Sequence, residues 1–355
     1  MTSMAARMRK GESRLLRPAQ GAALTAGLLG FAVVAFAVPS AEMTAVSARK
    51  PSATSTPTAT TTNPASTAPA SGTTGALREQ RLASPDRVVV RDDLGPVATF
   101  TVGSRTVGLR GPQRTFSEST TTARVISTTW VRLLAQPFKG TVDYGWLAAR
   151  IGDTSEDVLE LARQYVTGAP ERRDAAGLRI AGDASYGPLQ ADGTRAEGSD
   201  FNDYLGMHWS YRTEVDQPET DQFGALDCSG YVRMVFGHRA GISMTLQPDG
   251  LALPRRAVQM SDSAPGVVVI PDSGTRPTSL AALLPGDLIF FDASTDDGTL
   301  IDHVGIYLGI DSAGAPRFLS SRKSADGPTM GDIRGRSTLS GTGLYATAFR
   351  AARRV

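Results

Sequence analysis

The sequence predicts a protein of the α+β class. Residues 155–167 and 228–240 carry apolar side chains at the spacing of one helix face, whereas 288–291, 303–309 and 317–321 are short apolar runs of the strand type. A helix followed by strands that can pair in antiparallel fashion is typical of this class. We therefore expect helices packed against one small antiparallel sheet.

The first part of the folded region is rich in predicted strands. Its β-branched residues gather in short runs between Gly-Pro pairs and single glycines, which end strands and begin turns. The pattern predicts a small strand-rich unit over residues 80–140, and nothing in the sequence indicates its role. Its expected strands are residues 87–91, 97–102 and 106–109, with a further run inside 120–134.

Two helices are expected between this unit and the cysteine. One covers residues 155–167 and begins after Thr154, a good N-cap residue, and a shorter one covers 144–151. Together they form a predicted helical connector over 141–180. Residues 182–226 read instead as a long loop with tyrosines, a tryptophan and many acidic residues. An aromatic loop of this length before a reactive residue often forms one wall of a binding site.

Residues 1–48 are typical of an export signal. A basic start is followed by an uncharged apolar stretch at 21–38, the order found in secretory signals. That stretch is also long enough for an uncleaved membrane anchor, and the absence of cysteine here excludes a lipid anchor. Since the basic end stays inside, we expect the remainder to be secreted or held in a bacterial cell envelope.

Residues 49–76 are mostly Ser, Thr, Pro and Ala, which predicts a disordered tether.

Charge and ligand counts argue against several functions. The chain has 37 Lys and Arg against 35 Asp and Glu, a net charge of +2, so there is no general electrostatic case for a nucleic-acid partner. One cysteine and three scattered histidines do not give the spacing of a zinc site. We expect no metal, no cofactor and a monomer.

Cys228 is the only cysteine in the chain, and predicted export makes it a candidate reactive thiol. It begins a predicted helix, whose dipole stabilises a thiolate. Asp227 and Ser229 can accept free amide hydrogens there, and we expect both to line the substrate site. His303 opens a later strand-like run, and if that run packs on the helix its imidazole can serve as the base. A lone cysteine acting as a small hydrophobe and a structural histidine are the alternatives.

Four motifs follow one another along the chain: DCSG at 227–230, LPRR at 253–256 with Gln259, PGDLIFF at 285–291 and HVGIYLG at 303–309. In this order they resemble the NlpC-type bacterial cell-wall cysteine peptidases. The resemblance implies a papain-like α+β core, in which a cysteine on a helix packs against a small antiparallel sheet. It also implies hydrolysis of peptidoglycan stem peptides, commonly between D-glutamate and a diamino acid. By this likeness Cys228 is the nucleophile, His303 is the base, and a peptidase domain spans 181–355.

Two features depart from the pattern of that family. Its members usually carry a histidine on the strand after the base, whereas the matching strand 317–322 has none, and Ser320 falls nearest to that place. A serine would hold an imidazolium less firmly than a histidine or a carboxylate would. The aromatic and glycine-rich run that usually precedes the cysteine is also missing. Tyr186 is its closest remnant, separated from Cys228 by an insertion over 193–223, and we expect Tyr186 to line the substrate groove.

Three functions are consistent with these residues. The first is an exported peptidoglycan endopeptidase in which a thiolate–imidazolium pair attacks the peptide carbonyl and backbone amides near Cys228 hold the oxyanion. The second is a catalytically silent wall-binding module, favoured by the missing third histidine. The third is a thiol acyltransferase or amidase on the same scaffold. We also expect the thiolate of Cys228 to be abundant, so that iodoacetamide labels this residue rapidly at neutral pH. Of the other histidines, His238 is expected to be a structural cation at a helix end. His208, beside Trp209 in the acidic loop, is expected to be structural, with a role in the substrate groove as the alternative.

Overall fold

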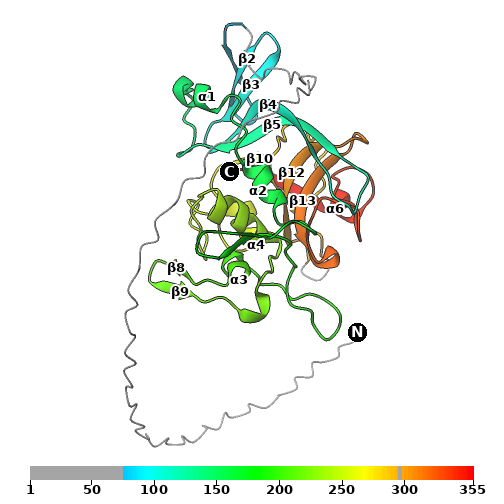
Figure 1. The fold of residues 1–355 in the computed structure, drawn as a ribbon. Coiled ribbons are helices and arrows are strands. Elements are labelled where there is room, and N and C mark those ends of the chain that lie inside the picture. Colours follow the sequence, from blue (N-terminus) through cyan, green and yellow to red (C-terminus); the bar gives the residue numbers. More distant parts are fainter. Residues whose placement is uncertain (1–74, 295–297) are drawn as a thin grey trace, which may run out of the picture. The chain divides into compact units, whose positions relative to one another are not determined.

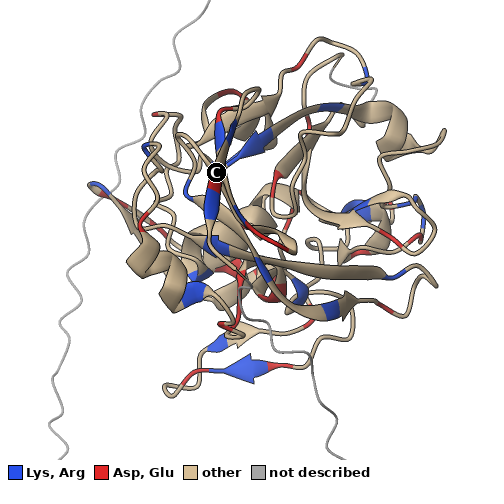
Figure 2. Ribbon diagram, turned by 90° about the horizontal axis from the view of Figure 1, so that it is seen from above, with Lys and Arg blue, Asp and Glu red and all other residues tan. Residues whose placement is uncertain are grey.

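The computed structural model describes residues 75–294 and 298–355, which belong to one compact unit. The predicted export signal or anchor at 1–48 lies outside the described residues, and so does nearly all of the tether at 49–76. Within the described ranges, no helix combines the length and the apolar character that crossing a membrane requires. Basic and acidic residues are interleaved along the ribbon of this unit (Figure 2).

A five-stranded antiparallel sheet forms the first part of the unit (Figure 1). Its strands follow the chain in order and enclose a small apolar core that helix α1 (Tyr144–Arg150) completes through Leu147. This confirms the strand-rich N-terminal region. The strands are β1 (Arg78–Leu82), β2 (Arg87–Asp92), β3 (Gly95–Thr101), β4 (Thr106–Phe116) and β5 (Val125–Leu133). The first of them was not predicted, because REQRL is polar and four of its five residues are exposed.

A six-stranded antiparallel sheet forms the second part, in the order β10-β15-β11-β12-β13-β14. Helices and this sheet together confirm the α+β class. Strand β15 comes last in the chain but lies between β10 and β11, so the C-terminal segment is built into the sheet. The strands are β10 (Val267–Ile270), β11 (Leu288–Phe291), β12 (His303–Ile310), β13 (Pro316–Arg322), β14 (Gly327–Thr329) and β15 (Phe349–Arg354).

The two faces of this sheet belong to different apolar cores. Val304 and Ile306 of β12 pack in the core that also contains Cys228 and most of the helices. Tyr307 of the same strand and Phe291 of β11 pack in a second core with Tyr345 of helix α6 (Leu344–Ala348). Alternate residues of a strand point to opposite faces, which explains why β12 reads as apolar throughout.

Helix α4 (Cys228–Val232) contacts β12 and β13 and continues as the π-helical turn η2 (Arg233–Arg239) (Figure 1). The predicted helix 228–240 therefore exists, but its second half is wound more loosely than an α-helix. The other elements are α2 (Val158–Arg163), α3 (Phe201–Leu205), α5 (Ala257–Ser263), the short pairs β6 (Arg172–Arg173) with β7 (Arg179–Ala181) and β8 (Trp209–Tyr211) with β9 (Glu214–Asp216), and the 3-10 turns η1 (Thr220–Gln222) and η3 (Lys323–Ala325).

Helix α2 begins later than predicted, because Asp157 and not Thr154 is its N-cap. The Asp157 carboxylate accepts the Glu160 amide at 2.9 Å and also binds Arg114 of β4. The ion pair with Arg114 therefore fixes the start of α2 against β4. The predicted connector at 141–180 is shared between two cores, since Leu147 of α1 packs with the first sheet while α2 packs with the Cys228 core. The domain boundaries themselves stay a prediction.

Candidate active site

Asp227 holds the start of helix α4 in place. Its Oδ1 accepts the Gly230 amide at 2.7 Å and the Ser229 hydroxyl at 3.1 Å, while its Oδ2 accepts from the Gly198 amide at 3.1 Å and from Arg255 at 2.7 Å. Burial acts to raise the pKa of Asp227, but the charge of Arg255 and these hydrogen bonds outweigh it and hold the pKa below its usual value. Asp227 is therefore an ionised, buried cap.

Gly230 allows the helix to approach its neighbouring loop. A Cβ at this position would lie 2.2 Å from the Ser199 carbonyl oxygen and 2.9 Å from the Asp200 Cα. No side chain fits in that space, so a glycine is required two residues after the cysteine. The backbone that passes close to Gly230 is thus the 199–200 segment.

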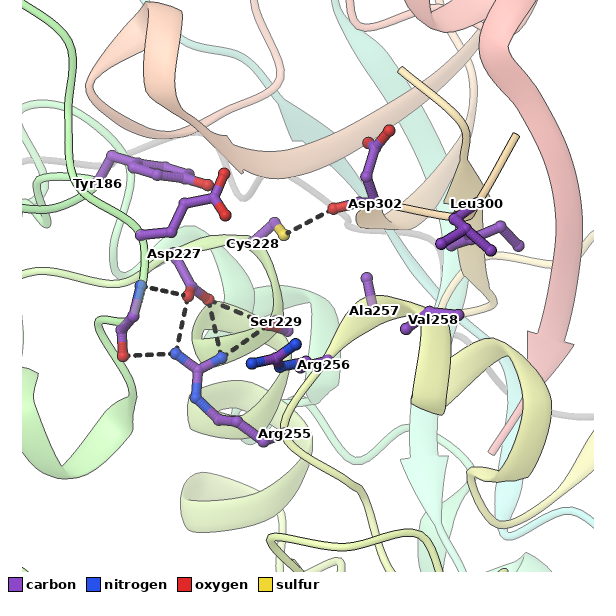
Figure 3. A pocket seen from close by; sticks show the side chains of 13 residues that line it. Tyr186, Asp227, Cys228, Ser229, Arg255, Arg256, Ala257, Val258, Leu300 and Asp302 are labelled. Atoms are coloured by element: carbon purple, nitrogen blue, oxygen red, sulfur yellow. Dashed lines mark hydrogen bonds and ion pairs between the residues drawn. The ribbon is translucent and has the colours of Figure 1, made fainter. Parts of the chain in front are cut away.

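Arg255 connects the cysteine-bearing helix to this loop. It donates to the Ser229 hydroxyl at 2.8 Å and to the Gly198 carbonyl at 2.6 Å, besides its pair with Asp227 (Figure 3). A second carboxylate, Asp200, lies 3.5 Å from Arg255 and pairs at 2.8 Å with the fully buried Arg233. The result is a network of alternating charges beneath the thiol.

Cys228 is 6% exposed and lines a cavity of about 580 Å³. The thiol donates to the Asp302 carbonyl at 3.9 Å (Figure 3). Burial, followed by the negative charge of Asp227, raises the pKa of Cys228 to about 12, and a hydrogen bond from the Val304 amide acts in the opposite direction. The thiol is therefore neutral at pH 7, which corrects the expectation of an abundant thiolate.

His303 begins β12, and its ring lies with aromatic residues of the second core. Its centroid is 5.3 Å from that of Tyr345 and 5.7 Å from that of Phe291. Burial, followed by the nearby charge of Arg322, lowers the pKa of His303 to about 3. Among the described residues, His303 Nε2 has no hydrogen-bond partner, and no hydrogen bond joins this ring to Cys228. The sulfur instead contacts the backbone on either side of His303.

Ser320 does not orient the imidazole in this structure. It lies on β13 next to Gly305, where its Cβ is 3.2 Å from the position that a Gly305 Cβ would occupy. Its hydroxyl is buried and has no hydrogen-bond partner in the described part of the chain. The ring of His303 is thus positioned by aromatic packing, and the role assigned to Ser320 stays a prediction.

The residues expected to bind substrate do share the cavity with the cysteine. Tyr186, Asp227 and Ser229 line it together with Cys228. Tyr186 is only 4% exposed, and burial, followed by the neighbouring Cys228, raises its pKa well above the usual value. Its backbone amide donates to the Asp326 carboxylate, which fixes the loop that carries it. Tyr186 thus forms part of the cavity wall, and its role in binding substrate stays a prediction.

Several residues of the site were not predicted. Arg255 lies inside the LPRR motif but received no role, because sequence spacing does not show that its side chain turns back to Asp227. Arg322 lies 5.2 Å from the ring centroid of Tyr345, and both are beside His303. Arg322 follows Ser320 by two residues on one strand, whereas Tyr345 lies beyond every motif and had no signal in the sequence.

The remaining histidines lie away from the cavity. His238 stacks on Phe201 with centroids 5.6 Å apart, and burial, followed by Arg239, lowers its pKa. It is therefore neutral at pH 7, and the prediction of a cation at the helix end is wrong. Within the described ranges, no three metal-ligating side chains converge.

A cysteine at a capped helix start, packed on an antiparallel sheet and opening into a cavity, defines the papain-like class of folds. Residues 209–336 match the model of the NlpC/P60 family, so the chain contains an NlpC/P60 domain. Members of this family are generally cell-wall peptidases. A search of curated proteins found no match.

Solved structures similar to the chain include a Staphylococcus aureus protein described as similar to lipoprotein, of the NLP/P60 family. It is 20% identical with a TM-score of 0.26, and the match covers 59% of this chain and 47% of that one. NlpC2 and NlpC1 from Trichomonas vaginalis are each 13% identical, with TM-scores of 0.29 and 0.28. Each match covers 81% of this chain, with 96% of NlpC2 and 90% of NlpC1. The chain thus spans about half of the staphylococcal protein.

Proposed function

We propose that this protein is an exported peptidoglycan hydrolase that cuts stem peptides with Cys228 as its nucleophile. The observation that carries the proposal is the placement of Cys228 at the capped start of α4, on the wall of a cavity of about 580 Å³. The bond is the amide between D-glutamate and a diamino acid, as the family resemblance implies. Export depends on residues 1–48, and residues 181–355 form the catalytic domain.

The chemistry requires one proton transfer before attack. The Cys228 thiol gives up its hydrogen bond to the Asp302 carbonyl and transfers its proton to a ring nitrogen of His303. The resulting thiolate attacks the carbonyl carbon of the scissile amide. Backbone amides at the start of α4 stabilise the oxyanion. The intermediate then collapses, the amine leaves with the proton from His303, and a thioester remains on Cys228. Water, deprotonated by the same ring, releases the acid and restores the thiol.

The protonation states support this order of events. A general base must be unprotonated before it acts, and a pKa of about 3 keeps His303 neutral at pH 7. Its Nε2 has no hydrogen-bond partner within the described structure, and in the Nδ1–H tautomer this nitrogen can accept a proton. The ring must turn from the aromatic cluster toward Cys228, since the cavity lining includes the sulfur but not the imidazole.

The silent wall-binding module is the second candidate, and one observation favours it. The imidazole is buried among aromatic rings, and Ser320 gives it no hydrogen bond. A base with so low a pKa is also a weak acceptor. The third function, a thiol acyltransferase or amidase, would use the same nucleophile but act on a different acyl donor or pass the acyl group to a different acceptor.

One assay separates these functions. The full chain and its Cys228→Ala variant are each incubated with wall fragments, and new free amino groups are counted. The proposal expects release by the full chain and none by the variant. No release by the full chain would support the silent module, and release that persists in the variant would remove Cys228 from the mechanism. A thioester that passes to an added amine and not to water would indicate a transferase.

A further inference from the structure

The acidic residues of the Cys228 cavity all have partners. Glu197 pairs with Lys323 at 2.6 Å, and Asp227 pairs with Arg255 at 2.7 Å. The Asp302 carboxylate accepts the amides of Ala293 and Ser294 at 2.8 and 2.6 Å. Each of these carboxylates is thus engaged by the protein itself, two of them by a cation.

The two adjacent arginines of the cavity differ in this respect. Arg255 is held by Asp227, Asp200 and Ser229 and belongs to the scaffold. Arg256 is exposed, and its backbone amide donates to Gln259 at 3.2 Å, but within the described residues its guanidinium has no ion pair and donates no hydrogen bond. No dashed line reaches it in Figure 3. The cavity thus carries one positive charge that the described protein does not neutralise.

The surroundings of Arg256 indicate what this charge can bind. Ala257 and Val258 follow it on α5, and Leu300 completes an aliphatic wall of the same cavity (Figure 3). A ligand with an aliphatic chain that carries an anionic group complements this surface of one cation and three aliphatic side chains. In a peptide the anion is a carboxylate, which fits the planar fork of a guanidinium through two parallel hydrogen bonds.

We propose that Arg256 binds a free carboxylate of the substrate, so that the site rejects stem peptides in which that carboxylate is amidated. This inference rests on the proposed function, because it concerns the same cavity. An amide has no charge and replaces one acceptor with an NH₂ group, which would face the donors of Arg256. Two carboxylates are possible sources: the α-carboxylate of γ-linked D-glutamate and a carboxylate of the diamino acid.

The test measures binding, so that it does not depend on hydrolysis. Three tripeptides of alanine, γ-linked D-glutamate and diaminopimelate are used: one with free carboxylates, one amidated at glutamate and one amidated at the diamino acid. Their affinities for the full-chain Cys228→Ala protein are measured by calorimetry. We expect one amidated peptide to bind about tenfold more weakly than the free one, the size of a lost charge-assisted hydrogen bond. That peptide identifies the source.

Adding Arg256→Gln should weaken the free peptide by the same factor and abolish the discrimination. Arg256→Lys should restore part of it, since the charge returns without the fork. Arg124→Gln is the matched control, because Arg124 is an exposed arginine that does not line the cavity. Equal binding of all three peptides, or an equal loss in the Arg124 variant, would overturn the inference. Hydrolysis by the unmutated chain is scored separately, so a failure of the proposed function is seen independently.

Discussion

Cys228 and His303 both rest uncharged in this site, and the same physical cause acts on both. Burial disfavours the charged form of each group, so it raises the thiol pKa to about 12 and lowers the imidazole pKa to about 3. Their immediate neighbours add to this effect, because Asp227 opposes a thiolate and Arg322 opposes an imidazolium. An ion pair between them would have to form together with substrate binding.

Alkylation of Cys228 tests the neutral thiol. We expect iodoacetamide to label the folded chain much more slowly than free cysteine at pH 7, and the rate to rise as the pH increases toward about 12, because only the thiolate reacts. Mass spectrometry gives the rate without ambiguity, since the chain has one cysteine. The urea-unfolded chain is the control and should react like free cysteine. Labelling at pH 7 that outpaces free cysteine would mean that an imidazolium already stabilises the thiolate.

The titration of His303 gives a prediction for stability. Its folded pKa of about 3 lies below the value of 6.5 for an unperturbed histidine, so the unfolded chain binds the proton more readily. The stability that neutral His303 contributes is complete above pH 6.5 and is lost as the pH falls toward 3, by up to about 1.4 kcal/mol per pH unit. We expect the unfolding free energy of the full chain to fall more steeply between pH 6.5 and 4.5 than that of His303→Gln. Parallel slopes would show that the ring is protonated, or exposed, in solution.

At the scale of elements, the start of α4 depends on a close contact between two backbones. Helix α4 is short, and its position relies on the Asp227 cap and on the 199–200 segment that touches Gly230. Arg255 then joins the same segment to the same cap. The sulfur is placed by this contact more than by helix propensity, because α4 and its π-helical continuation together are too short to be stable alone.

Gly230→Ala should therefore destabilise the protein, although alanine is the better helix former. Its methyl group would lie 2.2 Å from the Ser199 carbonyl oxygen, so the helix or the loop must move. We expect a loss of about 1–3 kcal/mol in urea unfolding, as for overpacked cores, together with reduced hydrolysis. Gly108→Ala is the control, since its new Cβ would meet only a Thr129 methyl group at 3.4 Å. Equal stability of both variants would contradict the close contact.

At the scale of the whole molecule, the two sheets are joined through a buried ion pair. Arg354 of β15 is 1% exposed and pairs with the fully buried Asp287 through contacts of 2.7 and 2.8 Å. The same guanidinium donates to the Thr101 hydroxyl of β3 at 2.7 Å. Strand β15 thus belongs to the second sheet and holds the end of the first.

The sequence predicted these parts of the molecule unequally. Periodic apolar runs identified most strands and helix α4, because burial on one or two faces leaves a pattern in the chain. The motif around Cys228 likewise indicated the thiol and the residues beside it. The sequence did not indicate that the His303 ring lies against Tyr345, because that contact is set by how the C-terminal segment enters the sheet. Nor did it indicate the Arg354 link, since a charged residue near the end of a chain reads as solvated.

Replacing Arg354 with methionine should weaken both sheets at once. The change leaves Asp287 buried without this partner, which costs about 3–5 kcal/mol when one member of a buried pair is removed. Tryptophan fluorescence during urea unfolding measures this effect, with Trp130 and Trp146 in the first part and Trp209 in the second. We expect the urea midpoint to fall equally for the probes of both parts. Variants that keep a tryptophan in only one part, with the others changed to phenylalanine, report the unfolding of that part separately.

Adding Asp287→Asn to Arg354→Met should recover part of the loss, because the amide that remains carries no buried charge. This recovery separates the electrostatic cause from the loss of packing around a long side chain. If Arg354 joins the two sheets, both probes must unfold in one transition in the unmutated chain. Two separate midpoints in the unmutated chain would mean that the first sheet unfolds independently, and the buried pair would then stabilise the second sheet alone.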